Sequence, residues 1–200
     1  MQGLFCDSAR LRALEMQMQQ PPGYRPRGHG ISIIGEVEWQ RYGSYMDIVD
    51  YAVGKIHLDE LRERIKEIFS KPDRDVIFYN ARHRKAFRSL MMEGRWNPMH
   101  SPEYVATVFL LTAEDELWDK VRRNVMDTGI YFDRMRIGGV TLEQYILFHA
   151  AKDIYNGTRH IQISELTDRE LVPDEILRLI INASVIARCG TGVIEMGGMG

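Results

Sequence analysis

The chain has 200 residues, of which 44 % are hydrophobic and 27 % are charged, and its formal net charge is −2. This composition is typical of a globular domain and excludes a largely disordered chain. The nearly neutral net charge excludes a global attraction to nucleic acid or to an anionic membrane, so any basic surface has to be local.

The first 74 residues predict a mixed α/β extension. Spaced apolar residues indicate two helices, β-branched residues with partial alternation indicate a strand, and one segment fits either state. These elements are a helix over residues 8–20, a strand over residues 31–39, an ambiguous segment over residues 45–54 and a helix over residues 57–70. The stretch 71–75, which contains Pro72, is the predicted boundary of this extension.

Residues 75–189 predict a helical domain of about five helices. The segment 76–80 is predicted as a short strand or an extended lead-in. The helices are predicted over residues 80–92, 101–111, 112–125, 141–156 and 173–189. The overall prediction is a mainly α (α+β) fold in which residues 75–189 fold by themselves, followed by a flexible Gly- and Met-rich tail over residues 190–200.

The clearest of these helices begins at Thr141. Thr141 and Gln144 have the spacing of a capping box, and Asn156-Gly157 supplies the usual end signal. The helix is apolar nearly all round, so we expect it to be central and buried.

A basic run lies on the helix predicted over residues 80–92. It comprises Arg82, Arg84, Lys85 and Arg88. A charged run on an amphipathic helix is usually a solvated surface, and the alternative is an anion-facing patch for nucleic acid or an acidic partner. The aromatic residue interleaved with these cations, Phe87, is predicted to face inward, so RNA stacking is not favoured.

Two residue pairs are weak candidates for chemistry. Arg95 and His100 have the Arg-x4-His spacing of helical ribonucleases of the HEPN type, but Pro98 lies between them and favours a polar loop. His149 and Asp153 lie four residues apart and share a helix face, where a metal could bridge them. Two ligands do not make a metal site, so we expect a buried, hydrogen-bonded His149 and no bound metal or cofactor.

The cysteine content and the absence of a leader predict a cytoplasmic protein. Cys6 and Cys189 lie near opposite ends of the chain, which is typical of a reducing compartment rather than of a disulfide framework. The N-terminus lacks a basic segment followed by an apolar run, and no apolar stretch approaches the roughly 20 residues that cross a bilayer. We therefore expect no membrane segment.

Three stretches stand out in the second half of the chain: an "FYNARHRKAF" opening, "IYNG" at the end of a helix, and a C-terminal "DEILRLIINASVIAR" helix. Over about residues 76–188, the chain resembles in these stretches a family of small helical domains of unknown function from Gram-positive bacteria, their phages and mobile elements. The matching residues are Phe78, His83, Phe87, Tyr155, Asn156, Gly157, Leu166, Asp174 and Glu175. These are helix-cap and core positions, so the resemblance implies a phage or mobile-element setting inside a bacterial host but no activity.

The leading hypothesis from the sequence is a non-enzymatic accessory protein that acts by binding another macromolecule. A protein partner is expected, for instance a host defence complex such as a CRISPR nuclease, and nucleic acid is the alternative partner through the basic run. One competing hypothesis is a HEPN-like or metal-dependent phosphodiesterase, and another is a virion or morphogenesis component. Partner specificity is expected to lie in residues 1–74.

Overall fold

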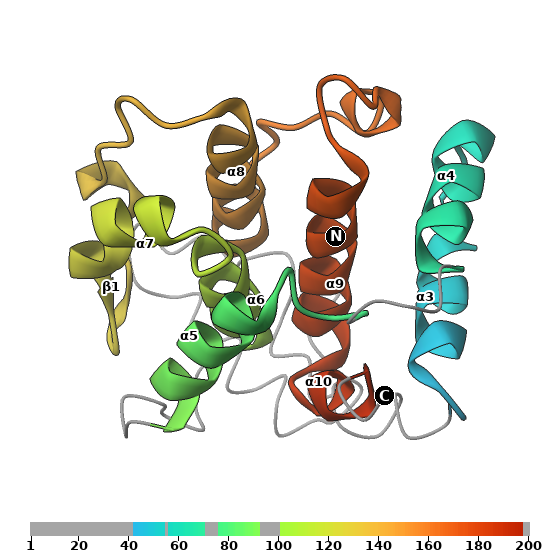
Figure 1. The fold of residues 1–200 in the computed structure, drawn as a ribbon, viewed down its shortest axis with the longest axis horizontal. Helices are drawn as coiled ribbons and strands as arrows, with labels where there is room; N and C mark the ends of the chain where they lie inside the picture. Colours follow the sequence, from blue (N-terminus) through green and yellow to red (C-terminus); the bar gives the residue numbers. More distant parts are fainter. Residues whose placement is uncertain (1–41, 55, 71–75, 93–100, 198–200) are drawn as a thin grey trace, which may run out of the picture.

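The computed structural model describes residues 42–54, 56–70, 76–92 and 101–197, and in these residues the fold is mainly helical, as the sequence predicts (Figure 1). The α-helices are α3 (Tyr45–Val53), α4 (Asp59–Phe69), α5 (Ala81–Met92), α6 (Pro102–Leu111), α7 (Asp115–Val121), α8 (Leu142–Asn156), α9 (Asp174–Cys189) and α10 (Gly192–Gly197). The short elements are the 3-10 turns η2 (Arg122–Asn124), η3 (Phe132–Arg134) and η4 (Glu165–Thr167) and the antiparallel pair β1 (Val125–Met126) and β2 (Gly129–Ile130).

Some predicted elements differ from the observed ones. The ambiguous segment 45–54 is helical, because the Ser44 side chain accepts the N–H of Asp47 and caps α3. Residues 76–80 form no strand, and Thr112 ends α6 instead of starting the next helix, which is the shorter α7. The predicted helix 8–20 and strand 31–39 lie outside the described residues.

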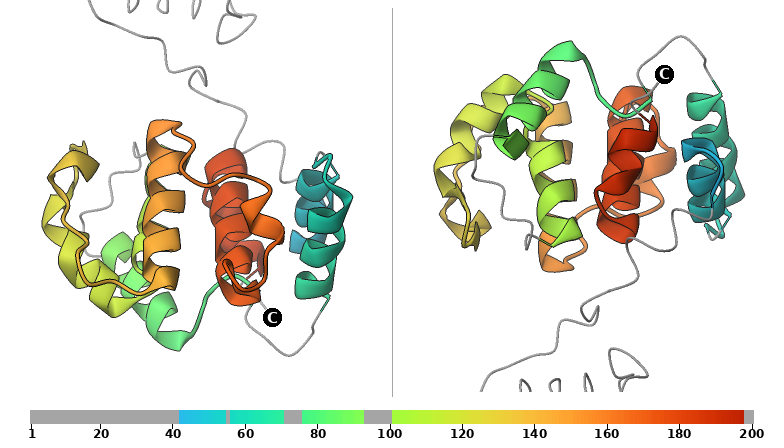
Figure 2. Two further views of the ribbon diagram at one scale, coloured as in Figure 1. Left: turned by 90° about the horizontal axis from the view of Figure 1, so that it is seen from above. Right: turned by 90° about the horizontal axis from the view of Figure 1, so that it is seen from below.

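Helix α6 lies at the centre of the fold. Every residue from Val105 to Leu111 is buried, because α6 packs against both α8 and α9 (Figures 1 and 2). The buried hydroxyl of Thr107 donates to the carbonyl of Glu103 on its own helix and approaches the carbonyl of Ala151 on α8. The prediction that the helix from residue 141 is buried all round is therefore only half right: α8 buries one face, and Leu142 and Tyr145 on the other face are exposed.

Helices α3 and α4 cover the side of α9 that faces away from α8 (Figure 2). Their apolar residues, among them Ile48, Leu61 and Ile65, belong to the same hydrophobic cluster as the residues of α6, α8 and α9. The described residues before position 71 therefore share one core with those after position 75. The predicted boundary itself, at residues 71–75, lies outside the described residues.

The end of the chain is more ordered than the sequence predicts. A flexible tail is expected from residue 190, but residues 192–197 form α10, and Val193 is fully buried in the core. Helix α10 lies beside the end of α9 and contacts α3. The expectation of a mobile tail is therefore wrong for residues 192–197, because the apolar Val193 supplies a packing residue among the glycines.

Two buried polar side chains of α9 hold the segment before α5. The guanidinium of Arg178 donates to the carbonyls of Val76 and Phe78 and forms an ion pair with Glu175 one turn earlier on α9, with Nη2 2.8 Å from Oε2. Arg178 is 5 % exposed, so these acceptors replace the water that its charge loses on burial. Backbone carbonyls of a non-regular segment are thereby satisfied, which explains how an irregular chain can be buried here.

Asn182, one turn further along α9, completes this arrangement. Its amide donates to the carbonyls of Val76 and Ile77, and its oxygen accepts the hydroxyl of Tyr45 at 2.6 Å. Burial raises the pKa of the Tyr45 hydroxyl, which therefore stays protonated and can donate. Asn182 thus connects α3, α9 and the segment before α5.

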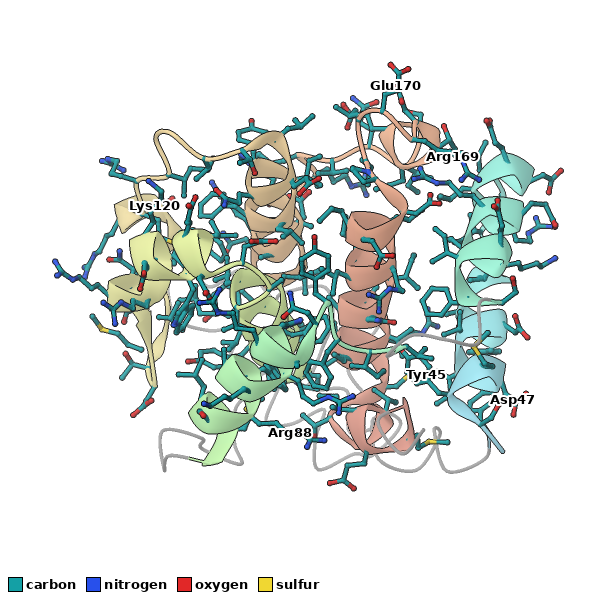
Figure 3. The ribbon with its side chains drawn as sticks, in the orientation of Figure 1. Tyr45, Asp47, Arg88, Lys120, Arg169 and Glu170 are labelled. Carbon is teal, nitrogen blue, oxygen red and sulfur yellow. The ribbon has the colours of Figure 1, made fainter. Side chains whose placement is uncertain are left out.

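Arg64 connects α4 to the loop that precedes α9. Its side chain is 3 % exposed and forms an ion pair with Asp174, with Nη2 2.8 Å from Oδ1. It also donates to the carbonyls of Leu166 and Val172. Arg169 approaches the other oxygen of Asp174 at 3.0 Å and Glu67 of α4 at 2.6 Å, which adds a second, exposed connection between the same segments (Figure 3).

An aromatic cluster connects α5 and the segment before it to α6. The rings of Phe78, His83, Phe87 and Phe109 lie against one another with centroid distances between 4.6 and 6.5 Å. Nδ1 of His83 accepts the N–H of Tyr79, so Nε2 carries the proton and donates to the carbonyl of Phe109 at 2.8 Å. His83 is a core residue and does not belong to the exposed basic surface.

Candidate functional site

The four predicted binding cations of α5 do not form one uniform surface. Arg82 is 80 % exposed and pairs with Asp115 at the start of α7, with Nε 2.7 Å from Oδ2. The guanidinium of Arg84 lies over the Phe78 ring, 5.7 Å from its centroid. Lys85 and Arg88 are exposed, and Figure 3 shows Arg88 at the lower edge of the molecule.

An acidic group borders the basic helix. Burial, followed by the nearby Glu143, Asp115 and Glu116, raises the pKa of Glu114, which precedes α7. Arg82 acts in the opposite direction and favours the charged form of Glu114. The local field beside α5 is therefore of mixed sign, which favours the interpretation as a solvated helix surface over that of an anion-binding patch.

The other predicted pairs have different outcomes. Arg95 and His100 lie outside the described residues, so the ribonuclease-like pair stays a prediction. His149 and Asp153 do share one side of α8, but their polar atoms serve different partners. Within the described part of the chain, no group of three or more His, Cys, Asp or Glu side chains is arranged to hold a metal ion.

Asp153 anchors the loop that follows α8. Its carboxylate accepts the backbone N–H groups of His160 and Ile161, the hydroxyl of Thr158, and Nδ1–H of His160 at 2.6 Å. Burial alone would raise the pKa of Asp153, but these hydrogen bonds outweigh it and hold the pKa below its usual value. Since four donors already occupy both oxygens, Asp153 is a structural carboxylate in this fold.

His149 is not hydrogen-bonded in the way that the sequence predicts. The residue is half-buried, and its Nδ1 atom is buried without a hydrogen-bond partner. Its ring instead lies against the rings of Tyr145 and His160, with centroid distances of 4.2 and 4.8 Å. Burial, with the nearby His160, lowers the pKa of His149, so the neutral form prevails at neutral pH.

These rings form one wall of a small open pocket of about 100 Å³ between α8 and the segment 160–172. It is lined by Leu142, Tyr145, Ile146, His149, His160, Ile161, Glu165, Leu171 and Val172. Gly157 has a left-handed backbone conformation, with φ of 67°, which turns the chain at the end of α8. The next segment can therefore run back beside the helix, and this makes the pocket possible.

Exposed apolar side chains gather at this end of the molecule. Leu142 and Tyr145 on α8 are 51 % and 49 % exposed, and Ile163 in the following loop is 62 % exposed. Leu142 and Tyr145 line the pocket. We call the pocket together with Ile163 the α8 pocket surface; it is the best candidate site in the described residues, because its apolar side chains remain in water.

Sequence reasoning missed this site for a clear reason. Leu142 and Tyr145 have helical spacing and were assigned to a helix that is apolar nearly all round, so nothing marked them as exposed. The available signal was the Asn156-Gly157 turn, which predicts that the chain reverses here and can place residues 160–172 beside α8.

A change at His149 should alter the pH dependence of stability. The unfolded ring takes up a proton near pH 6.5, whereas the folded ring does so only at lower pH, so stability should fall as the pH drops below about 6.5. His149→Phe should remove this loss and, by eliminating the unpartnered Nδ1, should stabilise the protein by about 1 kcal/mol at pH 7. Urea unfolding at pH 7 and pH 5 measures both effects.

The control is His57→Phe, because His57 is an exposed histidine outside the site. If both substitutions change the free energy of unfolding equally at the two pH values, the burial of His149 has no energetic consequence.

A scan against protein-family models finds no match for this chain, and searches of the curated proteins and of the solved structures find no significantly similar protein. Among the described residues, no helix combines the length and the apolar character that crossing a membrane requires.

Proposed function

We propose that this chain is a non-enzymatic accessory protein of a phage or mobile element that acts in the bacterial cytoplasm by binding another macromolecule, in the first place a protein. One observation supports the binding function: the α8 pocket surface combines a pocket of about 100 Å³ with exposed apolar side chains. Exposed apolar groups around a pocket mark a site that gains free energy when a partner covers it. The phage setting rests on the sequence resemblance alone.

Inhibition of a host defence complex, such as a CRISPR nuclease, is one form that this function takes. Such an inhibitor needs no catalytic group and works by covering the partner's working surface. An enzyme that uses His149 and Asp153 is less well supported, because the Asp153 oxygens are committed to the loop 158–161. The pair Arg95 and His100 and the alternative role in virion assembly stay as hypotheses.

The binding function is tested by affinity capture from phage-infected cells. Tyr145→Lys places a positive charge in the exposed apolar surface, and it should abolish the capture of a specific partner while leaving the melting temperature nearly unchanged. Tyr51→Lys is the matched control, because Tyr51 is an exposed tyrosine on α3, away from the pocket. A partner that is captured equally by both variants and by the unchanged protein would place the binding surface elsewhere.

Nucleic acid is the alternative partner, and it has its own test. Lys85 and Arg88 are exposed cations of α5, as is Arg82, which pairs with Asp115. Reversing Lys85 and Arg88 to Glu should change stability by less than about 1 kcal/mol, because exposed charges contribute little to folding. We expect the double reversal to leave partner capture intact. Loss of a salt-dependent interaction with DNA or RNA on this reversal would instead support nucleic-acid binding.

A further inference from the structure

We propose that the pocket between α8 and the segment 160–172 binds one basic side chain, an arginine in preference to a lysine, of a protein partner. This inference rests on the proposed binding function and specifies the chemistry that the partner presents. The charge in the pocket wall, the rings beside it and the size of the pocket each support it.

The charge of the wall selects a cation. Glu165, in the η4 turn, is the one acidic side chain among the lining residues. One oxygen of this carboxylate accepts the backbone N–H of Gln162 at 2.7 Å, which fixes the side chain in place. A half-buried carboxylate beside apolar walls attracts a cation more strongly than the same group in open water.

The rings of the wall favour the same occupant. Tyr145 is half-exposed and lines the pocket, so a guanidinium can stack on its face. The adjacent His149 does not repel a cation at neutral pH, because burial lowers its pKa and keeps the ring neutral. Arginine suits this wall better than lysine, because its planar group stacks on aromatic faces and is more weakly hydrated.

The dimensions limit the occupant to a single side chain. A pocket of about 100 Å³ is smaller than the roughly 300–1,000 Å³ of typical small-molecule sites. The remaining walls, Ile146, Ile161, Leu171 and Val172, are aliphatic and match the methylene stem of an arginine. The exposed Leu142, which lines the pocket, can then contact an apolar residue beside that arginine in the partner.

The test uses N-acetyl-arginine amide as the probe and follows the ring signals of His149 and His160 by NMR. The probe should shift these signals saturably, and N-acetyl-leucine amide should shift them much less. Glu165→Gln retains an oxygen that can accept the Gln162 N–H, and it should weaken arginine binding about fivefold or more through loss of the charge. Glu170→Gln is the matched control, because Glu170 is an exposed carboxylate in the following loop that does not line the pocket (Figure 3).

Two results would overturn the inference. Equal binding of the leucine and arginine probes, unaffected by Glu165→Gln, would assign the pocket to an apolar anchor. Absence of saturable shifts with either probe would show that the pocket binds no isolated side chain. The inference and the proposed function can fail separately: if Tyr145→Lys abolishes partner capture while the arginine probe does not bind, the binding surface stands and only the basic anchor is wrong.

Discussion

Replacing Arg64 with Met should destabilise the protein by about 3–5 kcal/mol, because breaking a buried ion pair leaves its partners unsatisfied. The substitution removes one of the two cations that pair with Asp174 and the donors of the Leu166 and Val172 carbonyls. These groups lie in the loop before α9 and at the start of that helix, so the contact between α4 and this loop should weaken. Denaturant unfolding followed by circular dichroism measures the change in the free energy of unfolding.

Lys66→Met provides the control on the same helix. Lys66 pairs with Glu63 at 2.9 Å, but both side chains are at least half exposed, so its loss should cost less than about 1 kcal/mol. The contrast between the two variants is the result of interest. An equally small effect of both would mean that Arg64 gains no more from its buried partners than an exposed lysine gains from its surface partner.

A chain that begins at residue 75 should not unfold cooperatively. The sequence suggests that residues 75–189 form an independent domain, but α3 and α4 lie on α9 within one hydrophobic cluster. Removing them uncovers apolar residues of α9, takes the Tyr45 hydroxyl away from Asn182 and takes Arg64 away from Asp174. We expect strong binding of a hydrophobic dye and the loss of a sharp thermal transition.

A chain that begins at residue 42 is the matched control, since it retains α3 and α4. It should unfold in a single transition, and the difference between the two truncated chains then reports the contribution of residues 42–74 alone. A sharp transition of the shorter chain, with a melting temperature close to that of the control, would show that residues 75–200 fold independently and would restore the boundary near residue 74.

The helices with local signals were predictable from the sequence. Thr141 and Gln144 form the expected capping box at the start of α8, and Gly157 ends that helix in a left-handed conformation. Ser101 caps α6 ahead of a proline at the first helical position. Such signals involve residues three or four positions apart, so the sequence contains all the partners that the backbone needs.

Contacts between distant segments were not predictable in the same way. An apolar helix face indicates that a partner exists but not which segment supplies it, so the placement of α3 and α4 on α9 was missed. The partners of polar side chains were not predictable either. Arg64 is buried because Asp174, 110 positions away, lies beside it. Arg82 forms an ion pair because α7, which begins with Asp115, lies nearby. Burial of a charge is decided by such long-range partners.

The candidate site shows both kinds of information. Helical spacing placed His149 and Asp153 on one side of α8, as observed, because that spacing is a local property of the helix. Their roles depended on the loop 158–161, whose N–H groups occupy Asp153, whereas Nδ1 of His149 has no partner. The Asn156-Gly157 turn predicts locally that the chain reverses after α8. Which side chains of residues 160–172 then meet α8 to form the pocket is decided by tertiary contacts, because packing between the two segments depends on residues that are distant along the chain.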